Sequence, residues 1–181
     1  MAHSEPSMES PDYVQTSLAS AITLGMARGR FSRNVRLGAL NLLLTYQRGC
    51  AARCAYCGLA GDRRTDGADD TFIRVQWPTC RLDDLIARVR LGNHALERAC
   101  VAMVTHPRAL ADSLTVLRRL RAETSLLLSA LVAPPLLRGP LDIVRLRETG
   151  ADMLGVAVDA ATEALFRAHR GGAGLMSWNH Y

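Results

Sequence analysis

Along most of the chain, hydrophobic runs of strand length alternate with amphipathic segments of helix length. The first clear run, residues 37–46 (LGALNLLLTY), is almost continuously apolar, as expected for a strand buried on both faces of a parallel sheet. Further strands are predicted near residues 100–105, 125–132 and 153–158. The helical periodicity of the remaining segments predicts helices near residues 12–26, 81–91, 108–121, 141–149 and 161–169.

Four strands separated by helices of this length indicate βα units with right-handed crossovers. The predicted fold class is therefore α/β, a parallel βα-repeat partial barrel of about four units. The sequence stops after the fourth unit, whereas closure of such a barrel takes about six to eight. We expect a barrel that is truncated at its C-terminus and has an exposed sheet edge prone to associate. A naturally open four-stranded sheet is the alternative.

The chain divides into a tail, a linking segment and a core. Residues 1–11 are polar (MAHSEPSMESP) and predict a mobile N-terminal tail. Residues 12–36 contain the first helix and a linker, because Arg28-Gly29-Arg30 ends the helical pattern. Residues 37–181 form the predicted βα core.

Composition narrows the class of protein. With 181 residues and 49% hydrophobic content, the chain has material for one globular core. It lacks an apolar run long enough for a membrane span, and its first residues do not resemble a signal peptide. We therefore expect a cytoplasmic protein, a reducing environment and no membrane partner. The net charge of +5 comes from arginines spread along the chain, and aromatics are only 5% of residues, so no nucleic-acid interface is expected.

The strongest chemical signal is a cysteine cluster, Cys50-Ala-Ala-Arg-Cys54-Ala-Tyr-Cys57, directly after the first apolar run. In α/β folds this carboxyl end of a strand is where active sites lie. Three thiolates can hold three irons of a [4Fe–4S] cluster and leave the fourth iron without a protein ligand. The alternative is a non-enzymatic zinc-binding module, which needs a fourth ligand; the candidates for it are Cys80, Cys100, His94 and His106.

The spacing of Cys50, Cys54 and Cys57, with Tyr56 before the last cysteine, resembles the signature of the radical S-adenosylmethionine (SAM) superfamily. The phrases LNLLLTYQRGCAARCAYCGLAGDR, ACVAMVTHP and GADMLGVAVDAATEALF resemble the biotin synthase and lipoyl synthase group. Within that group the chain looks most similar to the second subunit of two-component, archaeal-type lipoyl synthases.

This resemblance implies an enzyme in which Cys50, Cys54 and Cys57 bind a [4Fe–4S] cluster, and the open iron binds SAM. SAM is then cleaved to a 5′-deoxyadenosyl radical that abstracts hydrogen from an unactivated carbon, for sulfur insertion into protein-bound octanoyl chains. The implied partners are a lipoyl-accepting carrier protein, a second radical SAM subunit and a reductant such as ferredoxin or flavodoxin. A biotin synthase-like or other radical SAM enzyme with a different substrate is the alternative.

The resemblance also implies cofactor contacts. Tyr56 would flank the adenine of SAM, and backbone groups of Val104 and Thr105 would contact its amino group, although the Gly-Gly-Glu segment common there is absent. Asp159 matches a position that contacts the ribose, or else caps the helix that begins near residue 161. Arg170, with its neighbour His169, either approaches the SAM carboxylate or is a surface residue at a helix end.

A second iron–sulfur cluster is a further implication of the resemblance. Cys100 matches in place a cysteine that binds the sulfur-donating [2Fe–2S] cluster of biotin synthase. Its expected partner on the next strand is missing, since Ser125 and Ser129 occupy that stretch. The alternative is that Cys100 is an apolar core residue.

Overall fold

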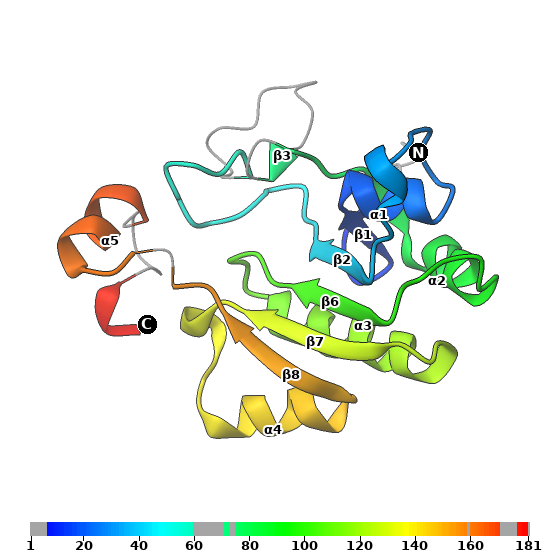
Figure 1. Cartoon of the computed structure of the whole chain (residues 1–181). Coiled ribbons are helices and arrows are strands. Elements are labelled where there is room, and N and C mark those ends of the chain that lie inside the picture. The colour runs from blue at the N-terminus through cyan, green and yellow to red at the C-terminus, as the bar shows by residue number, and fades with distance from the viewer. Residues whose placement is uncertain (1–6, 60–70, 73–74, 159, 171–176, 181) are drawn as a thin grey trace, which may run out of the picture.

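A computed structural model describes residues 7–59, 71–72, 75–158, 160–170 and 177–180. The described part is an α/β fold whose main feature is a six-stranded sheet of order β5-β1-β2-β6-β7-β8 (Figure 1). Its strands are β1 (Tyr13–Thr16), β2 (Ala39–Leu44), β5 (Thr79–Arg81), β6 (Arg98–Ala102), β7 (Leu127–Val132) and β8 (Ala151–Val156). The short strands β3 (Thr71–Phe72) and β4 (Val75–Gln76) pair separately.

The helices follow the strands in the predicted alternation. They are α1 (Leu18–Thr23), α2 (Leu82–Arg90), α3 (Ala109–Glu123), α4 (Pro140–Glu148) and α5 (Glu163–His169), with short 3-10 turns η1 (Ser32–Asn34), η2 (Pro134–Leu136) and η3 (Trp178–His180). Within the described ranges, no helix is long and apolar enough to cross a membrane.

Strands β2, β6, β7 and β8 are parallel neighbours, which confirms the four predicted strands and the α/β class. The described strands form an open sheet and not a closed barrel. The predicted strand at residues 100–105 is displaced toward the N-terminus, because pairing starts at Arg98 and ends at Ala102. The three residues after Ala102 leave the sheet and form part of the pocket described below.

The prediction of a continuous helix over residues 12–26 is wrong. Residues 13–16 form β1, which pairs antiparallel with β2 on one side and with β5 on the other. Ser17 then starts the short helix α1, and its side chain accepts a hydrogen bond from the N–H of Ser20 at 3.2 Å. The apolar spacing reads as helical across this junction, but burial of Val14 between two strands favours the extended form.

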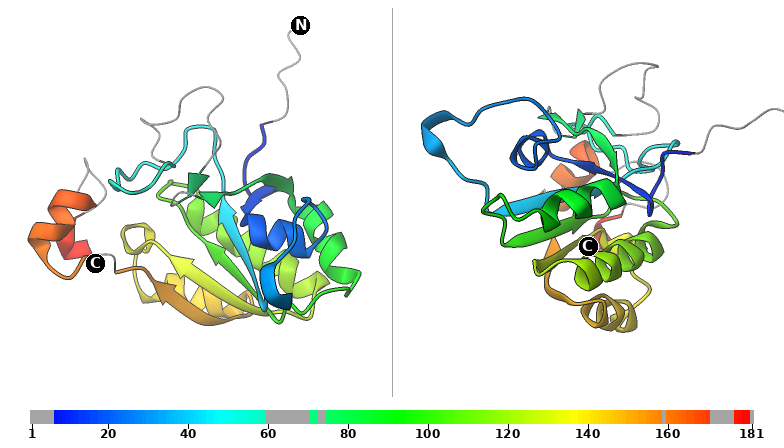
Figure 2. Two further views of the ribbon diagram at one scale, coloured as in Figure 1. Left: turned by 45° about the horizontal axis from the view of Figure 1, so that its top comes forward. Right: turned by 90° about the vertical axis from the view of Figure 1, so that its right-hand side faces the viewer.

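One face of the parallel strands is packed against helices (Figures 1 and 2). Helix α3 contacts β2, β6 and β7, and it lies between α2 and α4. The buried side of α2 repeats at helical spacing, with Leu82, Leu85, Ile86 and Val89. The strand residues of this face are almost fully buried: Leu40, Leu42, Leu44, Ala99, Val101, Leu128, Ala130 and Val132.

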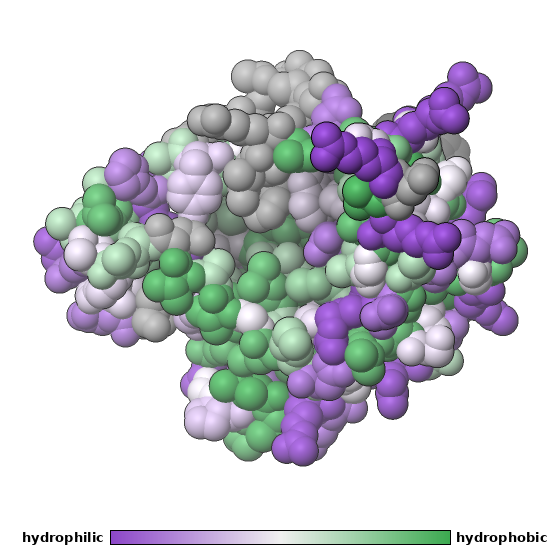
Figure 3. Space-filling view, viewed as in Figure 1, coloured by the Kyte–Doolittle hydropathy of each residue, from purple (hydrophilic) through white to green (hydrophobic). Residues whose placement is uncertain are grey.

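Strand β8 is an edge of the sheet and carries exposed apolar side chains, among them Met153, which is 54% exposed. Helix α4 beside it exposes Leu141, Ile143 and Val144. Figure 3 shows these hydrophobic side chains gathered over β7, β8 and α4. The exposed sheet edge expected from the sequence is therefore present. Its exposed apolar side chains are unusual, because sheets of parallel strands are normally covered on both faces.

Gly150 connects α4 to β8 in a conformation that favours glycine. Its φ is +96°, and a Cβ there would lie 2.8 Å from the Arg121 side chain. We expect Gly150→Ala to lower the free energy of unfolding by about 1–2 kcal/mol, because a left-handed backbone is strained in alanine. Urea denaturation measures this loss. Gly38→Ala is the matched control, since no atom lies within 4 Å of a Cβ there; an equal loss in both variants would contradict the assignment to backbone strain.

Candidate metal centre

The loop that carries Cys50, Cys54 and Cys57 leaves the carboxyl end of β2, as predicted. Its first residues are fixed to the turn after β6. The N–H of Ala51 donates to the carbonyl of Thr105 at 2.8 Å, and the N–H of Cys50 donates to the carbonyl of Leu59 at 2.8 Å. The first bond holds the loop against the segment that follows β6, and the second closes the loop on itself between Cys50 and Leu59.

The middle of the loop is fixed to α5, a helix that lies beyond the carboxyl ends of the strands (Figure 1). The N–H of Ala55 donates to the carbonyl of His169 at 2.7 Å. Phe166 of α5 is only 3% exposed and packs with Ala52 under the loop, while Trp178 meets the Phe166 ring edge-on at 5.8 Å. The cysteine loop is thus held between the sheet and a helix from the far end of the described chain.

All three cysteines line one pocket of about 290 Å³. The pocket is bounded by the cysteine loop, by the residues that follow β6, β7 and β8, and by the end of α5. Its lining is mostly apolar, and it includes Tyr56, Val104 and Thr105, three of the residues predicted to contact SAM. The described residues that line it include no His, Asp or Glu, so the thiols are its natural metal donors.

The thiols stand in different local settings. Cys50 Sγ accepts a hydrogen bond from the N–H of Thr105 at 3.2 Å. Cys54 and Cys57 are joined by a tight turn, in which the N–H of Cys57 donates to the carbonyl of Cys54 at 3.1 Å. Each thiol is half-buried. The N–H of Thr105 therefore holds the sulfur of Cys50, and the turn fixes the main chain between Cys54 and Cys57.

Among the described residues, no group of three or more His, Cys, Asp or Glu side chains is placed to hold a single metal ion. A zinc ion draws all its ligands to one centre, whereas a [4Fe–4S] cluster binds each cysteine through a different iron. Three thiols line one pocket whose described lining offers no His, Asp or Glu, a donor set that would suit three irons of such a cluster.

Neither of the other cysteines lines this pocket. Cys80 is in β5, where its thiol donates to the carbonyl of Val14 at 3.7 Å and burial raises its pKa to about 11. Cys100 is in β6, paired in register with Asn41 of β2 and Ser129 of β7, and burial raises its pKa too. Both thiols are thus held neutral, and neither is placed as the fourth ligand of a zinc site with the loop cysteines.

The two candidate histidines are held by other contacts. The His94 ring contacts the carbonyl of Val89 at 2.9 Å and accepts from the N–H of Leu96 at 3.2 Å. The His106 ring stacks on Tyr46, with ring centroids 3.7 Å apart, and burial and the nearby Arg108 lower its pKa. Neither histidine lines the cysteine pocket. None of the four candidate fourth ligands of a zinc site therefore lines the cysteine pocket.

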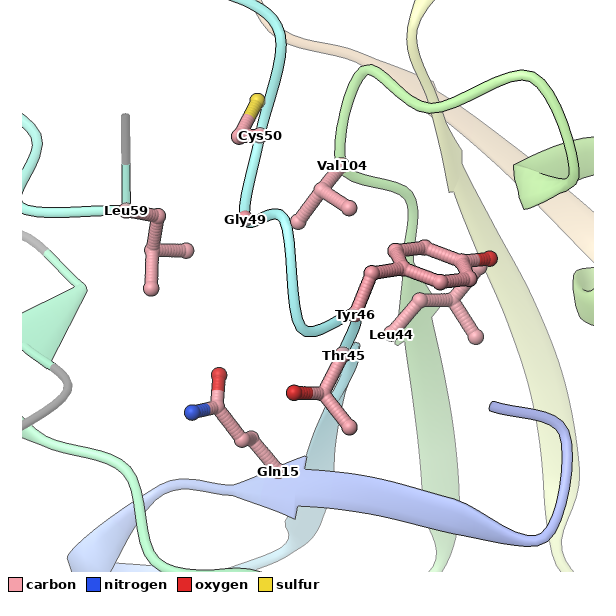
Figure 4. A pocket seen from close by; sticks show the side chains of 8 residues that line it. All are labelled: Gln15, Leu44, Thr45, Tyr46, Gly49, Cys50, Leu59 and Val104. Atoms are coloured by element: carbon pink, nitrogen blue, oxygen red, sulfur yellow. The ribbon is translucent and has the colours of Figure 1, made fainter. Parts of the chain in front are cut away.

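A buried polar network supports the floor of the loop. The Tyr46 hydroxyl donates to Asp112 of α3 at 2.8 Å, and burial raises the pKa of both groups. Arg108 lies over the Tyr46 ring and pairs with Glu9 at 2.6 Å. Tyr46 and Cys50 both line a small cavity of about 10 Å³, whose lining side chains are drawn in Figure 4. The network ties the start of the cysteine loop to α3 and to residues 9 and 10.

Arg170 corrects one of the sequence-based interpretations. It is not a surface residue at a helix end: it is 9% exposed and lines the cysteine pocket. One guanidinium nitrogen donates to the carbonyl of Ala157, after β8, at 2.9 Å. Among the described lining residues it is the one charged side chain. Asp159, predicted to contact the ribose of SAM, lies outside the described residues.

The sequence interpretation missed the apolar wall of the pocket. This wall consists of strand-end residues from three βα units: Ala102, Met103, Leu131, Val132, Ala133 and Ala157. The available signal was positional for Leu131, Val132, Ala133 and Ala157, which lie at or just after the carboxyl end of a predicted strand, where α/β folds bind ligands. Ala102 and Met103 fell inside the strand predicted at residues 100–105, because β6 ends earlier than predicted.

Comparison with known proteins adds no identification. No protein-family model matches the chain, and no curated protein matches it.

Proposed function

We propose that this chain is a radical SAM enzyme whose Cys50, Cys54 and Cys57 hold a [4Fe–4S] cluster. The observation that carries the proposal is the meeting of all three cysteines of the CxxxCxxC loop in one pocket at the carboxyl end of the parallel strands. When bound, the cluster would supply the electron that cleaves SAM to methionine and a 5′-deoxyadenosyl radical. The chain's own residues bind, orient and shield the reactants.

The pocket offers distinct groups to the two ends of SAM. Tyr56, which is 38% exposed, stands beside Cys57 and presents a ring at the pocket edge that suits an adenine. Backbone groups near Val104 and Thr105 follow β6 and suit the polar methionyl end. Arg170 supplies positive charge on the side of the pocket formed after β8, where it suits a carboxylate.

Sulfur insertion into a protein-bound octanoyl chain is the finer proposal. The family phrases in the sequence motivate it, and the apolar wall formed by residues such as Met103, Leu131 and Val132 supports it, since these side chains suit an alkyl chain. A second iron–sulfur cluster on Cys100 gains no support, because the strand residues opposite Cys100 are Asn41 and Ser129. A lipoyl-accepting carrier protein, a second radical SAM subunit and a ferredoxin or flavodoxin remain the expected partners.

Anaerobic reconstitution tests the class of enzyme. We would add iron and sulfide, reduce the protein with dithionite, and record its electron paramagnetic resonance spectrum with and without SAM. A [4Fe–4S] signal that changes on addition of SAM is expected. Stoichiometric zinc in a colourless protein, with no such signal, would contradict the proposal. Mass spectrometry of products formed with an octanoylated carrier protein then tests the substrate separately, since another radical SAM enzyme would still yield 5′-deoxyadenosine.

Arg170→Ala should weaken SAM binding at least about tenfold, because a charge-assisted hydrogen bond contributes about 1.5–3 kcal/mol. Calorimetric titration of SAM into the reconstituted protein measures the change. Iron content should stay at the wild-type level, since Arg170 offers no ligand to iron. Arg170→Lys keeps the charge and should recover part of the affinity. If Arg170→Ala loses iron, or if Arg170→Ala and Arg170→Lys bind SAM with equal affinity, Arg170 has a structural role and does not bind SAM through its charge.

A further inference from the structure

The largest of the described cavities lies away from the cysteines. It is an open groove of about 640 Å³ between residues 22–37 and the loop from α2 to β6. These segments precede β2 and β6, so the groove is at the amino ends of the parallel strands. The cysteine pocket is at the carboxyl ends. A ligand in the groove would therefore leave the cysteine pocket accessible.

The groove combines apolar walls with positive charge. Four apolar side chains line it: Ile22, Phe31, Val35 and Leu37. Phe31 and Val35 are 37% and 60% exposed, more than side chains of this kind need when they serve only as core. Arg30 and Arg36 also line the groove, whereas its described lining contains no Asp or Glu.

The charge extends beyond the groove itself. Between residues 28 and 36 the chain carries Arg28, Arg30, Arg33 and Arg36, and all four are exposed. In the part of the chain that the structure describes, none of these four forms an ion pair. Arg88 and Arg90, in the last turn of α2, are exposed too but do not line the groove. Elsewhere arginines do pair with carboxylates, for example Arg108 with Glu9 and Arg167 with Glu163.

Arg30 and Arg36 line the same groove and form no ion pair among the described residues, so an acidic partner that binds there offsets their like charges. The shape of the groove discriminates among anionic partners. Phe31 and Val35 line the groove, an arrangement that favours an apolar side chain entering it over insertion of these residues into a bilayer. Among the described lining residues, Phe31 is the one aromatic ring besides the imidazole of His94, which two backbone contacts hold, and this is too few for successive bases to stack.

We propose that this groove is a docking site for an acidic segment of a partner protein. The segment would place a large apolar side chain between Phe31 and Val35 and carboxylates beside Arg30 and Arg36. His94 forms part of the wall and not a contact for the carboxylates, because both ring nitrogens already have backbone partners. This proposal is independent of the radical SAM assignment, since no groove residue lines the cysteine pocket.

Fluorescence anisotropy with a labelled synthetic peptide, Glu-Glu-Leu-Asp-Phe-Glu-Glu, tests the proposal. The full chain should bind this peptide at least tenfold more tightly than the same peptide with Gln and Asn in place of its acids. The double variant Arg30→Gln/Arg36→Gln should lose at least tenfold in affinity. Val35→Ser, which leaves the charge unchanged, should lower the affinity for the peptide severalfold. Binding should also weaken as salt is added, because exposed charges are screened.

The matched control is Arg118→Gln/Arg147→Gln, which removes two exposed arginines from α3 and α4 and leaves the groove intact. It should bind the acidic peptide within twofold of the wild type. If both double variants lose the same affinity for the acidic peptide, binding depends on net charge alone and the proposal is wrong. Tighter binding to single-stranded oligonucleotides or to phosphatidylserine vesicles than to the peptide, abolished by Arg30→Gln/Arg36→Gln, would overturn it in favour of those partners.

Discussion

Cys54→Ala should abolish the [4Fe–4S] signal of the reconstituted protein and lower its rate of SAM cleavage at least about a hundredfold. Cys54 lies in the middle of the loop and lines the pocket with Cys50 and Cys57. With two thiolates left, no other His, Cys, Asp or Glu of the described pocket lining can replace the lost ligand. Iron analysis, visible absorbance and the yield of 5′-deoxyadenosine measure the result.

The control for this variant is Cys80→Ala, which removes a thiol from β5 outside the pocket. It should keep the wild-type iron content and the SAM-dependent spectral change. Circular dichroism of both variants tests whether each is folded. If Cys54→Ala keeps its cluster, or if Cys80→Ala loses it as well, the loop cysteines are not the ligands that we propose.

Leu128→Ala should lower the free energy of unfolding by about 3 kcal/mol, the usual cost of removing a large buried side chain. Leu128 is 0% exposed and lies in β7 on the sheet face covered by helices. Its register neighbours on the parallel strands, Ala99 and Ala151, are small and cannot fill the cavity. The total free energy of unfolding of a domain of this size is only about 5–15 kcal/mol, so urea denaturation should show a clear shift of the midpoint.

The adjacent leucine supplies the comparison. Leu127 belongs to the same strand but points to the opposite face, where it is 49% exposed. Leu127→Ala should lower the free energy of unfolding by about 0.5 kcal/mol or less, as is usual for a substitution at the surface. Similar losses at both positions would mean that the helix-covered face is not the main core.

The parallel part of the fold was predictable because its strands are apolar on both faces and the helices between them are clearly amphipathic. Residues 39–44 and 127–132 lie inside the predicted apolar runs. The N-terminal region was not predictable in the same way. Strand β1 has four residues and gains its stability from β2 and β5 on either side. A pairing between residues far apart in the chain leaves no local periodicity to detect.

The site was predictable in its chemistry and not in its surroundings. The spacing of Cys50, Cys54 and Cys57 predicts a metal-binding loop, and the structure brings the three residues to one pocket; metal binding itself stays a prediction. Nothing local marks Arg170 as a pocket residue: it follows a helix and precedes glycines, a pattern equally typical of a solvated helix end. Its burial results from the packing of α5 against the cysteine loop, a tertiary contact that the sequence pattern does not encode.

The bond between the N–H of Ala55 and the carbonyl of His169 also bears on the order of events during synthesis. The ribosome produces the cysteines early, but α5, which holds the middle of their loop, is produced after the parallel strands are complete. The loop cannot gain its contacts with Phe166 until that helix has emerged and packed. Delivery of iron and sulfide to a nascent chain would therefore meet a loop whose middle α5 does not yet hold, whereas delivery after release would meet a loop already held at both places.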